Sequence, residues 1–289
     1  MLDQATKLRQ MAEGNAIKKK KVNRDTKVFT ITSGKGGVGK SNIVVNLGIT
    51  LQKLGKKVMI FDADLGMGND DVLIGCVPKY SVFDTIFSGK EIEEVLVEGP
   101  HGIKLLPGGS GLSKVDDLTE VQRKIFLKKL EHLEGFDYIL IDTGAGINRS
   151  VLGFIACSDE LLIVTTPEPT ALTDAYSLLK AVSHFKIKTS AKVVVNRVFD
   201  EREGKNTFYK FNNAAQRFLN IKLFHLGNVS DDKRLTQAVR MQTPLVLAYP
   251  NSDSAKDIQN LAKEIEGINY KTDSEGIQGL FKRIFKVFS

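Results

Sequence analysis

The stretch GKGGVGKS at residues 34–41 decides the fold, because it fits the phosphate-binding pattern G-x-x-x-x-G-K-S/T. Glycines in such a loop let the backbone curl with its N–H groups pointing at a polyphosphate. The apolar run 28–32 before it predicts a strand, and the spacing of apolar residues in 42–54 predicts a helix. A strand, a glycine-rich loop and a helix N-terminus form an anion site. The sequence therefore predicts a nucleotide site, in which Lys40 reaches the β- and γ-phosphates and Ser41 ligates Mg²⁺.

A second lysine in this loop, Lys35, is not needed to build it. The motif K-G-G-x-G-K-S resembles the deviant Walker A loop of the MinD/ParA class of ATPases. The resemblance implies that Lys35 crosses a dimer interface to the ATP of a second subunit; the alternative is an ordinary solvent-exposed lysine. It also implies ATP or ADP contacts along the loop and the helix start, from Gly36, Gly37, Val38, Gly39, Lys40, Ser41 and Asn42.

Apolar runs alternate with helical stretches along the rest of the chain. Further strands are predicted at 57–61, 102–106, 137–141, 160–165, 192–195 and 222–226, and further helices at 118–133, 172–185, 207–219 and 233–241. Short continuous apolar runs are typical of parallel strands that are buried on both faces. The pattern predicts an α/β fold with one doubly wound, mostly parallel sheet flanked by helices, and ligands at the carboxyl ends of the strands.

Carboxylates stand where two of these strands end. Residues 62–66 resemble the D-x-D-x-G switch I segment of the family, with Asn69 at a further polar position. The resemblance implies that Asp62 joins the Mg²⁺ shell and that Asp64 orients or activates the attacking water. The alternative is that both acids cap a turn, since Asp is common in loops.

Asp142 ends the strand 137–141, in the place of a Walker B carboxylate that holds Mg²⁺ directly or through water. The family commonly shows D-x-P-x-G here, so Gly144 departs from its pattern and loosens the expected switch II geometry. Gly146 is still expected to offer its N–H to the γ-phosphate.

The pair Asn196-Arg197 follows the strand 192–195. The resemblance implies that this pair recognises adenine, and a side-chain amide offers the donor and acceptor that the base edge requires. The alternative is ordinary turn chemistry. Residues 166–171 resemble the loop that leads to a dimer-face helix, and 243–245 resemble a segment that closes over the base.

Composition limits the class of protein. A chain of 289 residues with 42% hydrophobic content can bury one substantial core. Cys76 and Cys157 lie far apart without a C-x-x-C pair, which argues against a zinc ribbon or an iron–sulfur site. No apolar stretch is long enough to span a bilayer and no secretory signal is present, so a cytoplasmic protein is expected.

The net charge of +7 is concentrated at the two ends of the chain. Residues 1–27 carry eight Lys/Arg and three Asp/Glu, and residues 271–289 carry four and two, so the body between them is neutral. A neutral body argues against DNA binding, and no specific nucleic-acid partner is expected. The basic ends favour contacts with an acidic partner or a membrane.

The C-terminal segment 271–289 is predicted to form an amphipathic helix that lies on the inner face of the cytoplasmic membrane. The alternatives are a helix packed on its own core or on a neighbouring subunit, and an ADP-state monomer could store it in a groove. The predicted membrane-binding residues form one apolar stripe with basic residues beside it: Ile277, Leu280, Phe281, Ile284, Phe285 and Phe288, with Lys282 and Arg283.

The N-terminal segment 1–26 reads by composition as a flexible basic arm ahead of an ATPase domain at 27–270. Its pattern D-Q-A-x-x-L-R resembles the amino-terminal signature of the FlhG family, MinD-like regulators of flagellar number. The resemblance implies contact with the GTPase FlhF, and contacts with flagellar basal-body proteins; the alternative is a tail without specific function. The predicted FlhF-contacting residues are Asp3, Gln4, Ala5, Leu8 and Arg9.

Together these features predict an ATP hydrolase that dimerises with Mg-ATP, cycles on and off the membrane, and regulates flagellar number and placement. Lys35, Lys40 and Asp64 are its expected catalytic residues. Two other classes share the body: the cell-division MinD ATPases, which generally lack the N-terminal arm, and the ParA/Soj partition ATPases, which bind DNA.

Overall fold

The computed structural model describes residues 26–64, 68–109, 118–130, 133, 135–268 and 276–288. The described residues form one eight-stranded sheet with the order β3-β4-β2-β5-β1-β6-β7-β8, in which β3 is antiparallel to β4 and every other pair is parallel. The strands are β1 (Lys27–Thr32), β2 (Val58–Ala63), β3 (Val97–Glu98), β4 (Lys104–Pro107), β5 (Tyr138–Thr143), β6 (Glu160–Thr165), β7 (Ser190–Val198) and β8 (Lys222–Ser230).

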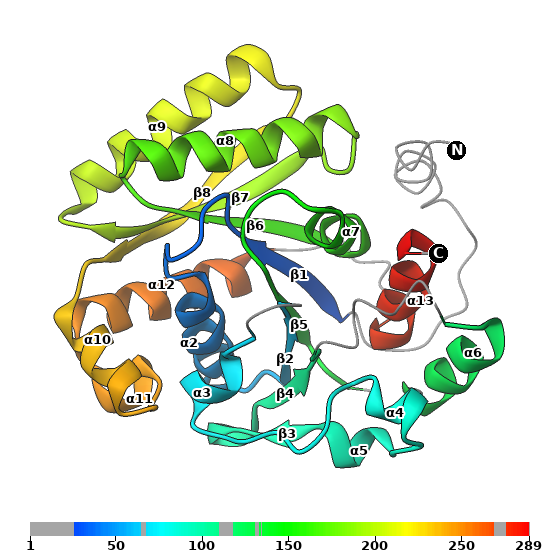
Figure 1. Ribbon diagram of the computed structural model, residues 1–289. Helices are drawn as coiled ribbons and strands as arrows, with labels where there is room; N and C mark the ends of the chain where they lie inside the picture. The colour runs from blue at the N-terminus through cyan, green and yellow to red at the C-terminus, as the bar shows by residue number, and fades with distance from the viewer. Residues whose placement is uncertain are drawn as a thin grey trace.

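Helices cover both faces of the sheet (Figure 1). One face packs against α2 (Lys40–Lys53), α11 (Leu245–Ala248) and α12 (Asp253–Gly267), with α3 (Asp70–Ile74) and α10 (Lys233–Arg240) beside them. The other face packs against α4 (Asp84–Phe87), α5 (Ile92–Val95), α6 (Glu120–Lys129), α7 (Arg149–Cys157), α8 (Pro169–His184), α9 (Glu201–Phe218) and α13 (Gly276–Phe288).

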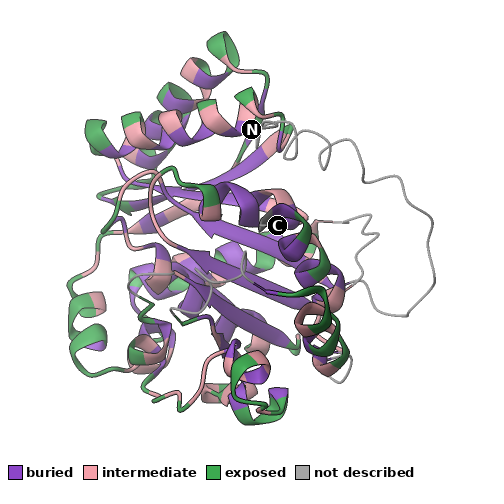
Figure 2. Cartoon of the chain, turned by 45° about the vertical axis from the view of Figure 1, so that its right-hand side comes forward, coloured by how far each residue is buried: buried purple, intermediate pink, exposed green. Residues whose placement is uncertain are grey.

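The core lies on both sides of the sheet because successive side chains of a strand point to opposite faces. In β1, Phe29 and Ile31 join the cluster under α2 and α12, whereas Val28 joins the cluster under α7 and α13. In Figure 2 the strands are almost wholly buried, and the helices are buried only along the side that meets the sheet. This double burial explains why the strands read as continuous apolar runs.

The predicted strands and helices are present, with boundaries that differ by a few residues and with an earlier start for α9, at Glu201. The sequence reasoning missed α12, although Ser252 caps its N-terminus by accepting a hydrogen bond from the N–H of Ala255. It also missed α7 and the short elements α3, α4, α5, β3 and α11. Helices of four or five residues carry too little periodicity to be recognised from a sequence.

The C-terminal helix α13 is docked on the body of the protein. It contacts α6, α7 and β1, and its apolar stripe is buried from Ile277 to Phe285. The Phe281 ring lies 5.4 Å from that of Phe61 and 4.9 Å from that of Phe126, measured between centroids. The Nε2 of Gln278 donates to the backbone oxygen of Leu127 at 3.0 Å. The alternative of a helix packed on its own core therefore describes this state of the molecule.

Candidate nucleotide site

The phosphate-binding loop connects β1 to α2. Two of its positions have room only for glycine, because other parts of the chain pack closely against them. A Cβ on Gly34 would lie 2.1 Å from the backbone carbon of Asp174 in α8. Gly39 has φ +90°, and a Cβ there would lie 2.3 Å from the side-chain nitrogen of Asn196. A side chain at either position would displace the loop. The glycines thus serve close packing as well as the approach of phosphates.

Lys40 lies inside the loop and forms a buried ion pair with Asp142 at the end of β5. Its ammonium nitrogen is also 3.4 Å from the Ser41 hydroxyl oxygen. The three side chains that the sequence predicted for phosphate and Mg²⁺ therefore lie together. In this state the carboxylate of Asp142 neutralises the lysine charge that a nucleotide phosphate would otherwise meet.

Asp62 and Asp142 are direct neighbours in the register of β2 and β5, so their side chains leave the sheet on the same face. Both are buried. Burial and, next, the negative charge of Asp142 raise the pKa of Asp62 to about 7. A Ser hydroxyl and two carboxylates at the phosphate end of a nucleotide site form a donor set that fits Mg²⁺.

A third carboxylate, Asp70, completes this acidic cluster, and the sequence reasoning did not identify it. Asp70 is the first residue of α3 and is fully buried. Burial and then the charges of Asp142 and Asp62 raise the pKa of Asp70 well above the usual range. Asp70 stands in the polar run 69–71, where nothing in the sequence distinguishes it from Asp71.

The predicted switch residues lie at the rim of the site. Asp64 donates its backbone N–H to the Asp62 carboxylate at 3.2 Å, and its carboxylate oxygen lies 3.4 Å from where a Cβ on Gly144 would be. The backbone N–H of Gly146 donates to the Ser33 oxygen at 2.8 Å. In this state that N–H is therefore engaged by the protein, and a γ-phosphate would have to compete for it.

Lys35 turns away from the cluster around Lys40. Its ammonium nitrogen lies 3.1 Å from a carboxylate oxygen of Glu168 and 2.9 Å from the hydroxyl oxygen of Thr170. Both belong to the segment 166–171, which the sequence reasoning singled out as leading to a dimer-face helix. The structure thus joins these two sequence features at the N-terminus of α8.

The predicted adenine-binding pair lies at the end of β7. Asn196 is buried and donates its side-chain N–H to the Val38 backbone oxygen at 2.7 Å, so it contacts the phosphate loop itself. Arg197 is exposed and has φ +57°.

The segment 243–245 leads into α11, where the N–H of Val246 donates to the Asn46 side chain in α2 at 3.0 Å. Asn42 accepts a hydrogen bond through its backbone oxygen from the Asn46 amide.

The predicted membrane-binding residues divide by exposure. The apolar set from Ile277 to Phe285 is buried against the body, Lys282 and Lys286 are exposed, and Arg283 lies 3.8 Å from the Asp159 carboxylate.

No helix in the described part of the chain is long and apolar enough to cross a membrane. The predicted FlhF-contacting residues 3–9, and Leu65 and Gly66 of the switch I motif, lie outside the described residues.

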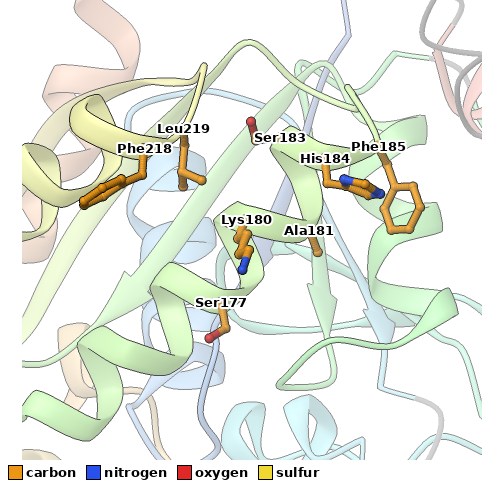
Figure 3. A pocket seen from close by; sticks show the side chains of 8 residues that line it. All are labelled: Ser177, Lys180, Ala181, Ser183, His184, Phe185, Phe218 and Leu219. Carbon is orange, nitrogen blue, oxygen red and sulfur yellow. The ribbon is translucent and has the colours of Figure 1, made fainter.

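A hollow of about 470 Å³ lies between the C-terminal ends of α8 and α9 (Figure 3). It is lined by Ser177, Lys180, Ala181, Ser183, His184, Phe185, Phe218 and Leu219. Lys35 meets the N-terminal end of α8, and that helix is about 24 Å long at 1.5 Å per residue. The hollow is therefore separate from the nucleotide site.

Comparison with known proteins agrees with this geometry. The family described as "AAA domain" matches residues 26–195. The antiactivator FleN of Pseudomonas aeruginosa is 35% identical over 83% of this chain and 86% of that protein. The flagellum site-determining protein YlxH of Helicobacter pylori is 35% identical over 91% of this chain and 90% of that protein.

A solved structure of the MinC:MinD cell division protein complex from Aquifex aeolicus has a TM-score of 0.67. It is 26% identical, and the match covers 86% of this chain and all of that chain. This protein thus has the fold of that structure. It carries a phosphate loop, two paired carboxylates at strand ends and an extra lysine in the loop. The protein therefore belongs to the FlhG (FleN/YlxH) family of P-loop ATPases in the MinD/ParA class, and it is an ATP hydrolase.

Proposed function

We propose that this ATPase regulates the number and placement of flagella. ATP would join two copies face to face, the dimer would bind the cytoplasmic membrane, and hydrolysis would release it. The N-terminal arm would activate the GTPase FlhF. The observation that carries the proposal is the similarity, over most of both chains, to relatives named as a flagellar antiactivator and as a flagellum site-determining protein.

Dimerisation is supported by the position of Lys35. Its side chain is partly exposed and lies beside the N-terminus of α8, away from the pair formed by Lys40 and Asp142. A lysine in this position is free to leave Glu168 and Thr170 for the phosphates of a second subunit, because exposed ion pairs are weak. Lys35 would then be catalytic in trans.

Hydrolysis would follow from positioning and charge neutralisation. Lys40 exchanges its ion pair with Asp142 for the β- and γ-phosphates, which frees Asp142 to act with Asp62 and Ser41 on Mg²⁺. Mg²⁺ would neutralise charge on the phosphates when bound. Asp64 at the rim, beside Gly144, orients the attacking water.

Membrane binding requires α13 to leave the body of the protein, because the apolar residues from Ile277 to Phe285 that would enter a bilayer are buried. We infer that α7 would link α13 to the nucleotide site. The segment 142–148 carries Asp142 and Gly146 and runs directly into α7, and α13 packs on α7. A shift of this segment on ATP binding would move the surface on which α13 rests.

The membrane step is tested by flotation with vesicles that contain anionic lipid, in ATP and in ADP. Replacing Lys282 and Lys286 by glutamine keeps the buried stripe intact but removes two exposed charges, worth about 1 kcal/mol each near an anionic surface. Weaker ATP-dependent binding is expected. Glutamine at Lys124 and Lys128, exposed lysines of the neighbouring helix α6, is the matched control. Equal binding by the two double variants and the original protein would show that Lys282 and Lys286 do not face the lipid, and an original protein that does not float with the vesicles in ATP would refute the membrane step.

The flagellar step is tested with a peptide of residues 1–21, added to purified FlhF with GTP. Stimulated GTP hydrolysis, lost on Gln4→Ala, is expected because the arm alone carries the D-Q-A-x-x-L-R pattern. No stimulation of an active FlhF would remove this step and favour the cell-division class instead.

A further inference from the structure

Asp70 is a buried acid whose negative charge the described structure compensates only in part, because burial and the charges of Asp142 and Asp62 raise its pKa more than Lys40 lowers it. Its side chain is fully shielded from solvent, and within the described residues neither of its carboxylate oxygens accepts a hydrogen bond. Among its neighbours the carboxylate of Asp142 raises the pKa of Asp70 most, and a hydrogen bond between the two carboxyl groups favours the protonated form of Asp70. A buried carboxylate in this situation costs stability unless a cation or a donor is supplied.

The position of Asp70 is fixed by the fold. Asp70 opens α3, α3 packs on α2, and its backbone N–H donates to the carboxylate of Asp62. The chain before it passes so close to Asp62 that a Cβ on Gly68 would lie 2.5 Å from a carboxylate oxygen. Asp70 is therefore held against both strand-end carboxylates and faces Lys40, the cation of the cluster.

This cluster lacks positive charge once a nucleotide is bound. Lys40 forms its ion pair with Asp142 and also lowers the pKa of Asp70, and a polyphosphate would draw this lysine away. No group of three or more His, Cys, Asp or Glu in the described chain forms an all-protein metal cage. Mg²⁺ normally keeps several waters and uses one or two carboxylates together with phosphates. The waters bound to the ion need hydrogen-bond acceptors from the surrounding protein.

We propose that Asp70 is a positioning residue of the magnesium site, which accepts a hydrogen bond from water bound to the ion beside Asp62 and Asp142. This inference rests on the proposed Mg²⁺ site. It explains why an acid without a donor is kept in a buried position. It also assigns α3 a role, since the helix carries the acceptor to the end of the sheet.

The test measures how Mg²⁺ tightens the binding of a fluorescent ADP, starting from EDTA-treated protein. With Asp70→Asn, we expect the Mg²⁺ concentration for half of the effect to rise about tenfold or more, the range found for residues that hydrogen-bond the ligands of a metal. ADP affinity in EDTA should stay equal or become tighter, because a negative charge near the phosphates is removed. Asp71→Asn, one residue along the same helix, is the matched control and should follow the original protein.

Thermal melting gives a second readout that does not depend on catalysis. In EDTA without nucleotide, Asp70→Asn should melt at or above the original protein, and the additional rise caused by Mg²⁺ with ADP should be smaller. Asp70→Leu serves if the asparagine variant folds poorly. A Mg²⁺ curve for Asp70→Asn that matches the original protein would overturn this assignment alone. Absence of any Mg²⁺ effect in the original protein would overturn the magnesium site itself.

Discussion

At the scale of single residues, the site is a set of three buried acids with one lysine, Lys40, among them. The ion pair between Lys40 and Asp142 satisfies one acid, while Asp62 and Asp70 stay close to that pair without a cation of their own. Like charges at close range cost energy in a medium of low dielectric. This arrangement of acids therefore lowers the stability of the folded protein.

The first prediction concerns pH. The pKa of Asp62 is near 3.8 in an unfolded chain, and burial together with the charge of Asp142 raises it to about 7 in the folded protein. Between these values the folded state holds more protons, so the free energy of unfolding falls as pH rises. EDTA-treated, nucleotide-free protein should therefore melt at a lower temperature at pH 7.5 than at pH 5.5. Asp62→Asn should reduce this slope and Asp71→Asn should not; a slope unchanged by Asp62→Asn would contradict the prediction.

The second prediction concerns Asp64, whose carboxylate lies at the rim beside Gly144. Asp64→Ala should slow ATP turnover by about 10²-fold or more, the range for a positioned acid–base group. ADP affinity should not change, because Asp64 is outside the cluster that holds the phosphates. Under ATP the variant should accumulate as a dimer in light scattering. A variant that stays monomeric with ATP would show that Asp64 has another role.

At the scale of elements, α13 is part of the hydrophobic core. Phe281 and Phe285 pack on Phe126 of α6, and Phe61 of β2 lies between Phe281 and Phe154 of α7. The helix therefore stabilises the same sheet that holds the nucleotide site. Its release would expose aromatic side chains on both surfaces. Binding to a membrane must therefore supply at least the free energy that α13 loses when its apolar side chains leave the core.

The third prediction follows from this packing. Phe281→Ala should lower the free energy of unfolding by about 3–5 kcal/mol, as for other fully buried aromatic residues. Lys282→Ala, the adjacent exposed position, should change it by less than about 0.5 kcal/mol. Urea unfolding monitored by circular dichroism measures both. Equal stabilities of the two variants would mean that α13 does not stay docked in solution.

At the scale of the whole molecule, the site residues that could be predicted from the sequence are those that directly follow an apolar run. Asp62 and Asp142 were found because a carboxylate at the end of a buried strand points to the ligand edge of the sheet. Asp70 could not be found, because burial of one acid in a polar run depends on how α3 packs. Docking of α13 was not decided either, since hydrophobic attraction has no direction and an apolar stripe suits a groove or a lipid surface equally.

The fourth prediction concerns the assembly. Lys35→Ala should abolish ATP-dependent dimerisation, measured by light scattering, and leave ADP affinity within about twofold. Within its own chain the Lys35 ammonium contacts only side chains at the start of α8 among the described residues, and exposed pairs of this kind contribute at most about 1 kcal/mol. Stability should accordingly be unchanged. An ATP dimer that still forms without Lys35 would refute its role in trans.

The alignment of β2 with β5 has a consequence for how this protein tolerates change. Asp62 and Asp142 sit opposite each other in that pairing, so the main-chain hydrogen bonds of two adjacent strands set the spacing of the carboxylates. The loops that follow can lengthen, shorten or exchange residues, as Gly144 shows, and the two carboxylates keep their separation. A single insertion inside either strand would turn one carboxylate to the opposite face. The loops can therefore change in sequence and length, whereas the lengths of β2 and β5 must stay constant for the site to survive.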